Sequence, residues 1–233
     1  PINESILGPG NFRLLGETGV RELVQEILEI FLIDDPQAAS VVAGFAGAGT
    51  PESQASIRDA FVEAGFGKVT ITSDAGLLLM SLKNNGIVLV AGTGSICMGR
   101  KPCADNPMGF DEYRAGGYGY RLMSEPGGYR VGIQAIDAAL RVTDGRSEQA
   151  TALEDVVRDY FRMSDLRQIV PELYPDEADT ESIQAKVAGL SPLVLAAAVE
   201  GDRVAGDIVS DTVDDMADHV RAVCRQLNLR DSV

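Results

Sequence analysis

The organisation of this chain is decided by one stretch, Ile87-Val88-Leu89-Val90-Ala91-Gly92-Thr93-Gly94-Ser95-Ile96-Cys97-Met98-Gly99. Its two ends are short apolar runs rich in β-branched residues, a composition typical of strands. Between them stands a turn with two glycines, Gly92-Thr93-Gly94-Ser95. The stretch therefore predicts two strands joined by a turn with consecutive exposed backbone N–H groups. A ligand can approach such a turn without hindrance from Cβ atoms, although an ordinary glycine hairpin would have the same sequence pattern.

The residues before this stretch follow a helix–strand–helix–strand–helix pattern. Apolar residues at helical spacing predict a first helix with Thr18 as its N-cap. A strand at Val41–Ala46 is followed by a helix that Thr50-Pro51 opens. A second strand at 69–72 is followed by a helix from about Ala75 to Lys83. Strands separated by helices pair in parallel, so the fold class is α/β.

The break at Asn84-Asn85-Gly86 divides the chain into domains at 1–85 and 86–233. In the second domain we expect a third strand within Tyr118–Leu122 and helices from about Val131 onward. Two parallel strands alone would leave long unpaired edges, and the helices would lack return strands to cover. We therefore expect both domains to be incomplete as given, with their remaining strands outside these 233 residues.

The composition excludes several classes of protein. Twenty Lys and Arg residues against thirty-five Asp and Glu residues give a net charge of −15, which disfavours nucleic-acid binding by a basic face. No apolar run approaches the roughly 20 residues of a membrane span. The three cysteines show no disulfide or metal-binding pattern, and the one histidine, His219, is expected to be a solvated helix position. We expect a cytoplasmic protein with no metal site built from its own side chains.

Asp74 is the first candidate for chemistry. It directly follows the second predicted parallel strand, and the carboxyl ends of such strands gather ligand-binding groups. A carboxylate placed there can accept the proton of a hydroxyl as that hydroxyl attacks a phosphoryl group. The alternative is that Asp74 only caps the helix that comes after it.

A glycine- and tyrosine-rich segment, residues 114–129, is the second candidate. Glycines that allow close approach, tyrosines and the carboxylate of Glu125 suit a pocket for sugar hydroxyls, and a flexible surface loop is the alternative. Gly47-Ala48-Gly49 raises a competing interpretation, a dinucleotide-binding turn. Glu52 stands where that motif needs its third small residue, and its charge would oppose a pyrophosphate.

These segments together resemble a known family. Ser73-Asp74-Ala75, then the stretch 86–95, then Gly116-Gly117-Tyr118-Gly119-Tyr120 follow the order of the N-acetylglucosamine kinase-like branch of the BadF/BadG/BcrA/BcrD ATPases. That branch lies in the superfamily that joins sugar kinases and actin. Gly8-Pro9-Gly10-Asn11 is similar to the family's sugar-contacting segment, and residues 196–202 to its helix pair near adenine.

The resemblance implies two ribonuclease-H-like lobes with ATP, Mg²⁺ and a sugar in the cleft between them. Asp74 would be the catalytic base, and Gly92, Thr93, Gly94 and Ser95 would bind the nucleotide. The sugar site would include Asn11, Gly117, Tyr118, Ser124 and Glu125. A homodimer is left open as an assembly.

Two departures from the family pattern stand out. The family's first phosphate loop and its adenosine segment have no counterpart here, so the fragment as given is expected to be weakly active or inactive. The family's Gly-Asp-Glu-Gly-Ser sugar loop reads Met123-Ser124-Glu125-Pro126-Gly127, so Ser124 replaces the sugar-binding Asp.

The expected function is ATP-dependent phosphorylation of an amino sugar such as N-acetylglucosamine or glucosamine. A non-catalytic sugar or nucleotide sensor on a degenerate kinase scaffold is the first alternative, because of Ser124 and the absent phosphate loop. The ATPase activator of an acyl-CoA dehydratase is the second, although the three cysteines do not suit the iron–sulfur cluster that it needs.

Overall fold

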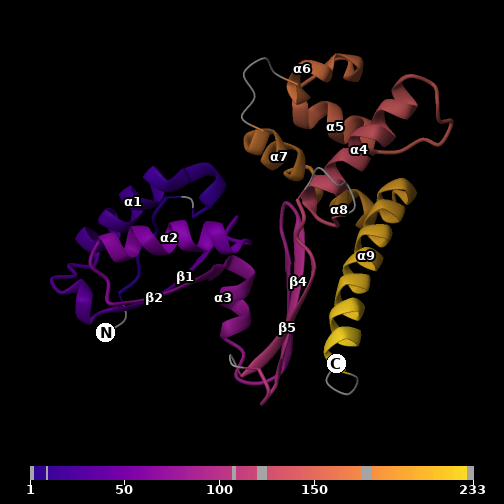
Figure 1. Cartoon of the computed structure of the whole chain (residues 1–233). Helices are drawn as coiled ribbons and strands as arrows, with labels where there is room; N and C mark the ends of the chain where they lie inside the picture. The colour runs from indigo at the N-terminus through magenta and orange to yellow at the C-terminus, as the bar shows by residue number, and fades with distance from the viewer. Residues whose placement is uncertain (1–2, 9, 107–108, 120–124, 175–179, 230–233) are drawn as a thin grey trace. The chain divides into compact units, whose positions relative to one another are not determined.

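The computed structural model (Figure 1) describes residues 3–8, 10–106, 109–119, 125–174 and 180–229. The chain divides into two units, Pro1–Val88 and Leu89–Val233, which we call unit 1 and unit 2. Unit 1 contains α1 (Phe12–Ile30), η1 (Pro36–Ala38), β1 (Ser40–Phe45), α2 (Pro51–Glu63), β2 (Lys68–Ser73) and α3 (Asp74–Met80). β3 (Gly86–Ala91) begins at the end of unit 1. Unit 2 continues with β4 (Ser95–Pro102), β5 (Phe110–Gly116), α4 (Gly128–Thr143), α5 (Leu153–Phe161), η3 (Leu166–Gln168), α6 (Val170–Leu173), α7 (Thr180–Ala188), α8 (Ser191–Val199) and α9 (Arg203–Leu227).

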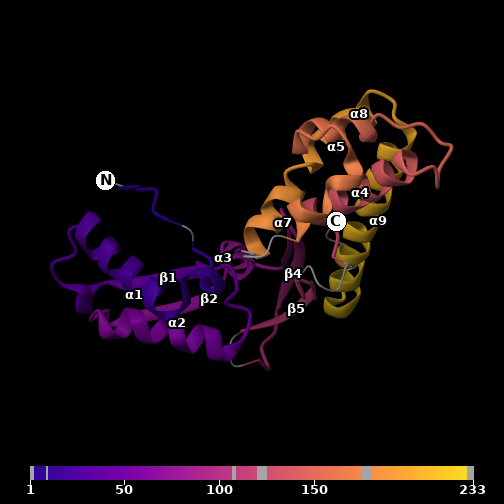
Figure 2. The same cartoon turned by 90° about the horizontal axis from the view of Figure 1, so that it is seen from above.

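Unit 1 is built on the parallel pair β1 and β2, as the alternation of strands and helices predicts. The register runs from Ser40 opposite Lys68 to Phe45 opposite Ser73, and Figure 2 shows the two strands side by side. The core between this pair and the helices includes Phe45, Phe61 and Phe66, whose rings meet edge to face. Burial of such large apolar side chains supplies the main stabilisation of the unit.

The helix boundaries in unit 1 follow local capping. Thr50 caps α2 and forms a capping box with Ser53, as the sequence predicts. The predicted N-cap of the first helix, Thr18, is wrong: α1 begins at Phe12, where Asn11 caps it. Gly16, with φ of 60°, kinks this helix, and the apolar periodicity shows only the part after the kink.

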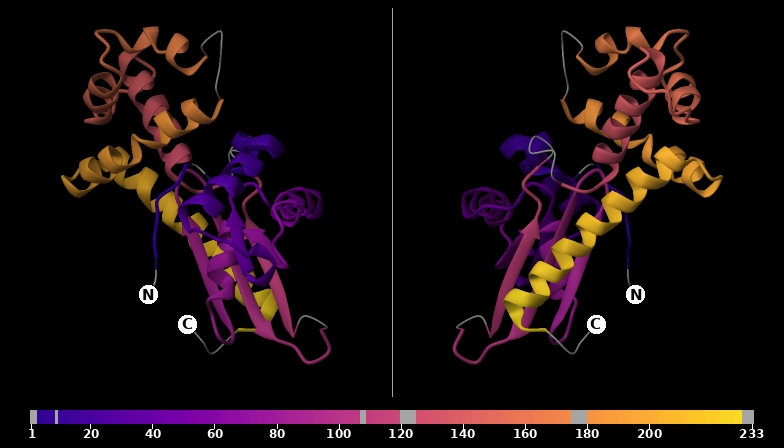
Figure 3. Two further views of the ribbon diagram at one scale, coloured as in Figure 1. Left: turned by 90° about the vertical axis from the view of Figure 1, so that its left-hand side faces the viewer. Right: turned by 90° about the vertical axis from the view of Figure 1, so that its right-hand side faces the viewer.

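Unit 2 carries a sheet with strand order β3-β4-β5, in which β4 and β5 are antiparallel. The third strand is therefore Phe110–Gly116, and the predicted strand within Tyr118–Leu122 is wrong as far as residue 119; residues 120–122 lie outside the described residues. Residues 117–119 form no strand because glycines at positive φ end the pairing. α9 packs along β4 and β5, as Figure 3 shows.

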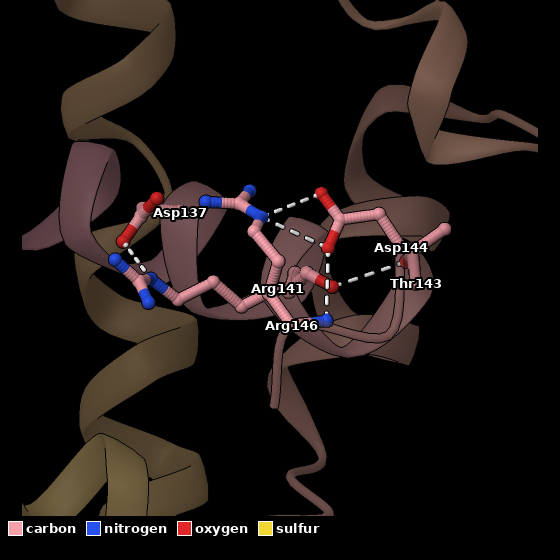
Figure 4. Close-up of polar contacts among 6 residues, drawn as sticks. Asp137, Arg141, Thr143, Asp144 and Arg146 are labelled. Atoms are coloured by element: carbon pink, nitrogen blue, oxygen red, sulfur yellow. Dashed lines mark hydrogen bonds and ion pairs between the residues drawn. The ribbon is translucent and has the colours of Figure 1, made fainter. Parts of the chain in front are cut away.

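The helices of unit 2 share one apolar core. Its fully buried members include Ala135, Leu153, Val157, Leu190 and Val194, from α4, α5, α8 and the turn before α8. Figure 4 shows the end of α4, where Arg141 pairs with Asp137 and Arg146 with Asp144. These pairs are exposed and add little to stability, so the apolar core holds the helices together.

Within the described residues, one stretch, Ser182–Val199, is long and apolar enough to cross a membrane. It comprises most of α7 and all of α8, with a turn between them at Gly189 and Leu190. Val187, Leu190 and Val194 of this stretch are buried in the unit 2 core. Packing within the unit therefore accounts for the apolar character of these positions.

Candidate active site

Asp74 is the first residue of α3 and directly follows the carboxyl end of β2. The side chain of Ser73 caps this helix by accepting a hydrogen bond from the backbone N–H of Gly76 at 3.0 Å. The alternative that Asp74 is the capping residue is therefore wrong. Its side chain is exposed, and a carboxylate in the first turn of a helix is stabilised by the helix dipole.

Asn11 lies at the same edge of the unit 1 sheet. It forms a parallel bridge with Ala46, just beyond the end of β1, and the N–H of Phe12 donates to the carbonyl of Ala46 at 2.9 Å. Because Phe45 of β1 lies opposite Ser73 of β2, the structure brings Asn11 and Asp74 to the ends of neighbouring parallel strands. This is the edge at which α/β sheets gather ligand-binding groups.

The turn Gly92-Thr93-Gly94 in unit 2 is exposed. A Cβ atom added to Gly92 or Gly94 would meet nothing within 4 Å, so one side of the turn is open to a ligand. Ser95, by contrast, is only 6% exposed, and its hydroxyl is buried with no hydrogen-bond partner among the residues described. The Ser95 hydroxyl, expected to donate to a phosphoryl group, thus does not face solvent here.

The turn is seated on the first residues of α4. The N–H groups of Gly128 and Tyr129 donate to the carbonyls of Gly92 and Thr93 at 2.8 and 2.9 Å. At Gly127, a Cβ atom would stand 2.8 Å from the Cα of Gly94, so only glycine permits this approach. Two hydrogen bonds and a close backbone contact therefore hold the turn against the start of α4.

In the glycine- and tyrosine-rich segment, Glu125 holds the described residues that follow β5, Gly117 and Tyr118. One carboxylate oxygen of Glu125 accepts from the N–H of Gly117 at 3.0 Å and the other from the N–H of Tyr118 at 3.1 Å. Glu125 is 7% exposed, whereas the ring of Tyr118 is exposed and lies 5.1 Å from the guanidinium carbon of Arg114. Glu125 therefore fixes the backbone at Gly117 and Tyr118. Ser124 lies outside the described residues.

The sequence does not reveal which part of the fold the His219 side chain contacts. We predicted a solvated helix position, which is wrong: its Nδ1 atom is buried and lies against Gly116 at the end of β5. Helical spacing along α9 cannot show which strand the helix covers. The only signal in the sequence is that His219 is the single histidine of the chain.

The cysteines do not form a site. Burial, together with the neighbouring Cys224, raises the pKa of the Cys97 thiol to about 11, so it stays protonated and inert, as expected of a core residue.

Among the residues that the structure describes, no group of three or more His, Cys, Asp or Glu side chains could hold a metal ion. A polar hollow of about 310 Å³ between Glu154, Arg158 and Asp165 includes no predicted site residue.

The chain is similar to known proteins in sequence and in fold. The sequence profile of the BadF/BadG/BcrA/BcrD ATPase family matches residues 2–233. The chain belongs to this family. Membership confirms the resemblance seen in the sequence and implies ATP as the nucleotide.

A curated relative of this family member is the N-acetylmuramic acid/N-acetylglucosamine kinase of Clostridium acetobutylicum. The two are 30% identical over 234 residues, which cover 97% of this chain and 73% of the relative. Two solved structures share the fold with TM-scores of 0.66, candidate N-acetylglucosamine kinases from Chromobacterium violaceum and Porphyromonas gingivalis. They are 24% and 19% identical, cover 97% and 96% of this chain, and are themselves covered to 74%. This likeness confirms the α/β fold class.

Proposed function

We propose that this BadF/BadG family member is an ATP-dependent sugar kinase that phosphorylates a hydroxyl of an amino sugar such as N-acetylglucosamine or glucosamine. The observation that carries the proposal is the exposed carboxylate of Asp74 at the carboxyl edge of β1 and β2, where Ser73 has taken over the capping role. The curated relative, a kinase of two amino sugars, supports the choice of substrate class.

In this proposal each group has one role. Units 1 and 2 are the two lobes, and Asp74 accepts the proton of the attacking sugar hydroxyl. Gly92 lets a phosphoryl group approach because it has no Cβ atom, while its N–H donates to the carbonyl of Gly94 at 2.8 Å. The backbone N–H groups of Thr93, Gly94 and Ser95 hold the phosphoryl oxygens. Asn11, Gly117 and Tyr118 line the sugar site. Glu125 holds the backbone of Gly117 and Tyr118 in place, and Ser124 is the remaining member of the sugar site.

The residues present fit a nucleoside triphosphate, because the turn is rich in glycine and open on one side. Mg²⁺ would neutralise phosphate charge and is expected to arrive with ATP, since such ions are bound largely through substrate phosphates and water. The protein is expected in the cytoplasm, where ATP is available. A homodimer is left open.

The test uses the complete gene product in an ADP-release assay with a panel of hexoses and amino sugars. Asp74→Asn keeps the size of the side chain but removes the base, so kcat should fall by about 10²- to 10⁴-fold. Asp59→Asn, an exposed carboxylate on α2, is the matched control and should leave kcat unchanged. Turnover that survives Asp74→Asn would refute the assignment of the base.

A non-catalytic sensor of sugar or nucleotide is the second candidate, favoured by Ser124 at the place of the family's sugar-binding Asp. The dehydratase-activator alternative is not favoured, because Cys97 is fully buried and so poorly placed for a cluster shared between subunits.

A further inference from the structure

His219 fills the space that a side chain at position 116 would occupy. A Cβ atom added to Gly116 would stand 2.6 Å from Cε1 and 2.9 Å from Nδ1 of the imidazole. Gly116 also has φ of +76°, a backbone conformation that favours glycine. The imidazole and the end of β5 are therefore fitted to each other, although one comes from α9 and the other from the sheet.

The Glu125 carboxylate shares this space. Its Oε2 atom lies 2.9 Å from the same Cβ position on Gly116 as Nδ1 does, so the two atoms are separated by at most twice that distance. The same Oε2 atom accepts the hydrogen bond from Gly117. The imidazole of His219 is thus a neighbour of the Glu125 carboxylate, which fixes the backbone at Gly117 and Tyr118.

The Nδ1 atom of His219 is buried and has no hydrogen-bond partner in the described parts of the chain. Buried polar atoms are paired in nearly all cases, so an orphan of this kind needs an explanation. If the side chain only filled space, an apolar residue would do so without loss of hydration. The carboxylate oxygen Oε2 of Glu125 lies against the same position on Gly116 and is a possible acceptor for a hydrogen on Nδ1.

We propose that His219 is a positioning residue of the sugar site: its Nδ1–H donates to the Glu125 carboxylate, and α9 thereby fixes where Gly117 and Tyr118 stand. The inference rests on the proposed function for the nature of the ligand. The contact between His219 and Glu125, and through it the placement of the N–H groups of Gly117 and Tyr118, does not depend on that function.

Two variants of the complete protein separate a polar role from simple packing. His219→Leu removes the donor and keeps an apolar side chain, whereas His219→Asn keeps an amide donor near the place of Nδ1. His219→Leu should raise the KM for sugar by about tenfold or more, the effect of one lost hydrogen bond to a charged group. Its kcat and its KM for ATP should stay near the wild-type values, and His219→Asn should recover most of the loss. Asp218→Asn, the exposed neighbour on α9, is the control and should match the wild type.

Hydrogen exchange of backbone amides gives a second readout that needs no activity. The amides of Gly117 and Tyr118 should exchange about tenfold faster in His219→Leu than in His219→Asn or the wild type, while α4 stays protected. Unchanged exchange and an unchanged sugar KM in His219→Leu would overturn the inference. Equal damage by Leu and Asn would also overturn it, since the role would then be packing alone. If the wild-type protein phosphorylates no sugar, the proposed function fails, and exchange at these two amides still decides the inference.

Discussion

Asp202 joins two helices of unit 2 through one carboxylate. It caps α9 by accepting from the N–H of Ala205 at 2.9 Å, and it also accepts from the N–H of Ala152 at 2.6 Å and the hydroxyl of Thr151. Burial acts to raise the pKa of this carboxyl, but the hydrogen bonds from Ala205, Ala152 and Thr151 together hold it below the ordinary value of 3.8. Folding therefore stabilises the charged form.

The depressed pKa predicts a pH-dependent contribution to stability. It is fully present above pH 3.8, the ordinary value, and is lost as the pH falls through the lower pKa of the folded state. Asp202→Asn keeps a capping oxygen but removes the charge, so it should lower the free energy of unfolding by about 1 kcal/mol at pH 7, the difference between a charged and a neutral acceptor. Denaturant titrations should show this difference shrinking below pH 3.8. Asp207→Asn, an exposed change on the same helix, should show neither effect; a constant difference for Asp202→Asn would contradict the account.

At the level of residues, the sequence predicts groups whose role depends on local position. The place of Asp74 at the end of β2 and the start of α3 could be predicted because both elements have local signals in the sequence. The burial of Ser95 and the contact between His219 and Gly116 depend on tertiary packing. Such contacts join positions about a hundred residues apart and leave no periodic signal.

At the level of elements, the turn between β3 and β4 depends on the glycine that precedes α4. A side chain on Gly127 would collide with the backbone of Gly94 and Thr93, at 2.8 and 2.9 Å, and backbone atoms cannot move aside as a flexible side chain can. The turn would have to shift from its seat on α4. Misplacement by about 1 Å is enough to cost about 10²-fold in rate.

Gly127→Ala should therefore reduce kcat/KM for ATP by about tenfold to a hundredfold in the ADP-release assay, because it displaces the turn that we propose to bind phosphate. Gly206→Ala is the matched control, since a Cβ atom there meets nothing within 4 Å. It lies within α9, where alanine is favoured over glycine, so activity should persist with slightly higher stability. Equal kcat/KM for ATP in Gly127→Ala and Gly206→Ala would show that activity does not depend on the contact between the turn and α4.

The elements that the sequence predicted well are those with local signals. The cap and proline at Thr50-Pro51 mark the start of α2, and the glycine turn marks β3 and β4. β5 was misplaced because Tyr118 and Tyr120 favour strand formation, whereas the true strand contains Asp111, Glu112 and Arg114, which do not. Pairing with β4, from Ile96 opposite Gly116 to Pro102 opposite Phe110, overrides that preference.

At the level of the whole molecule, a kinase and a sensor differ in whether chemistry takes place after ligands have bound. Either should be stabilised by ligand, and a concentration of 100 times Kd should add about 2.7 kcal/mol. We predict that a thermal-shift series will show stabilisation by ATP and by one amino sugar, accompanied by ADP production. Stabilisation by both ligands without any ADP would favour the sensor over the kinase.

The family and the α/β fold could be predicted from the sequence, because Asp74, the glycine turn and the Gly116–Tyr118 segment follow one another in the same order as in the family. The sugar could not, since Ser124 departs from the family pattern and the selectivity of a pocket depends on its full lining.

The most direct test is a crystal structure of the complete protein with a non-hydrolysable ATP analogue and N-acetylglucosamine. We predict that the Asp74 carboxylate lies about 2.6–3.2 Å from one sugar hydroxyl, with the backbone of Gly92–Gly94 against the phosphoryl groups. An Asp74 side chain more than about 10 Å from that turn in the ligand-bound protein would contradict the kinase account.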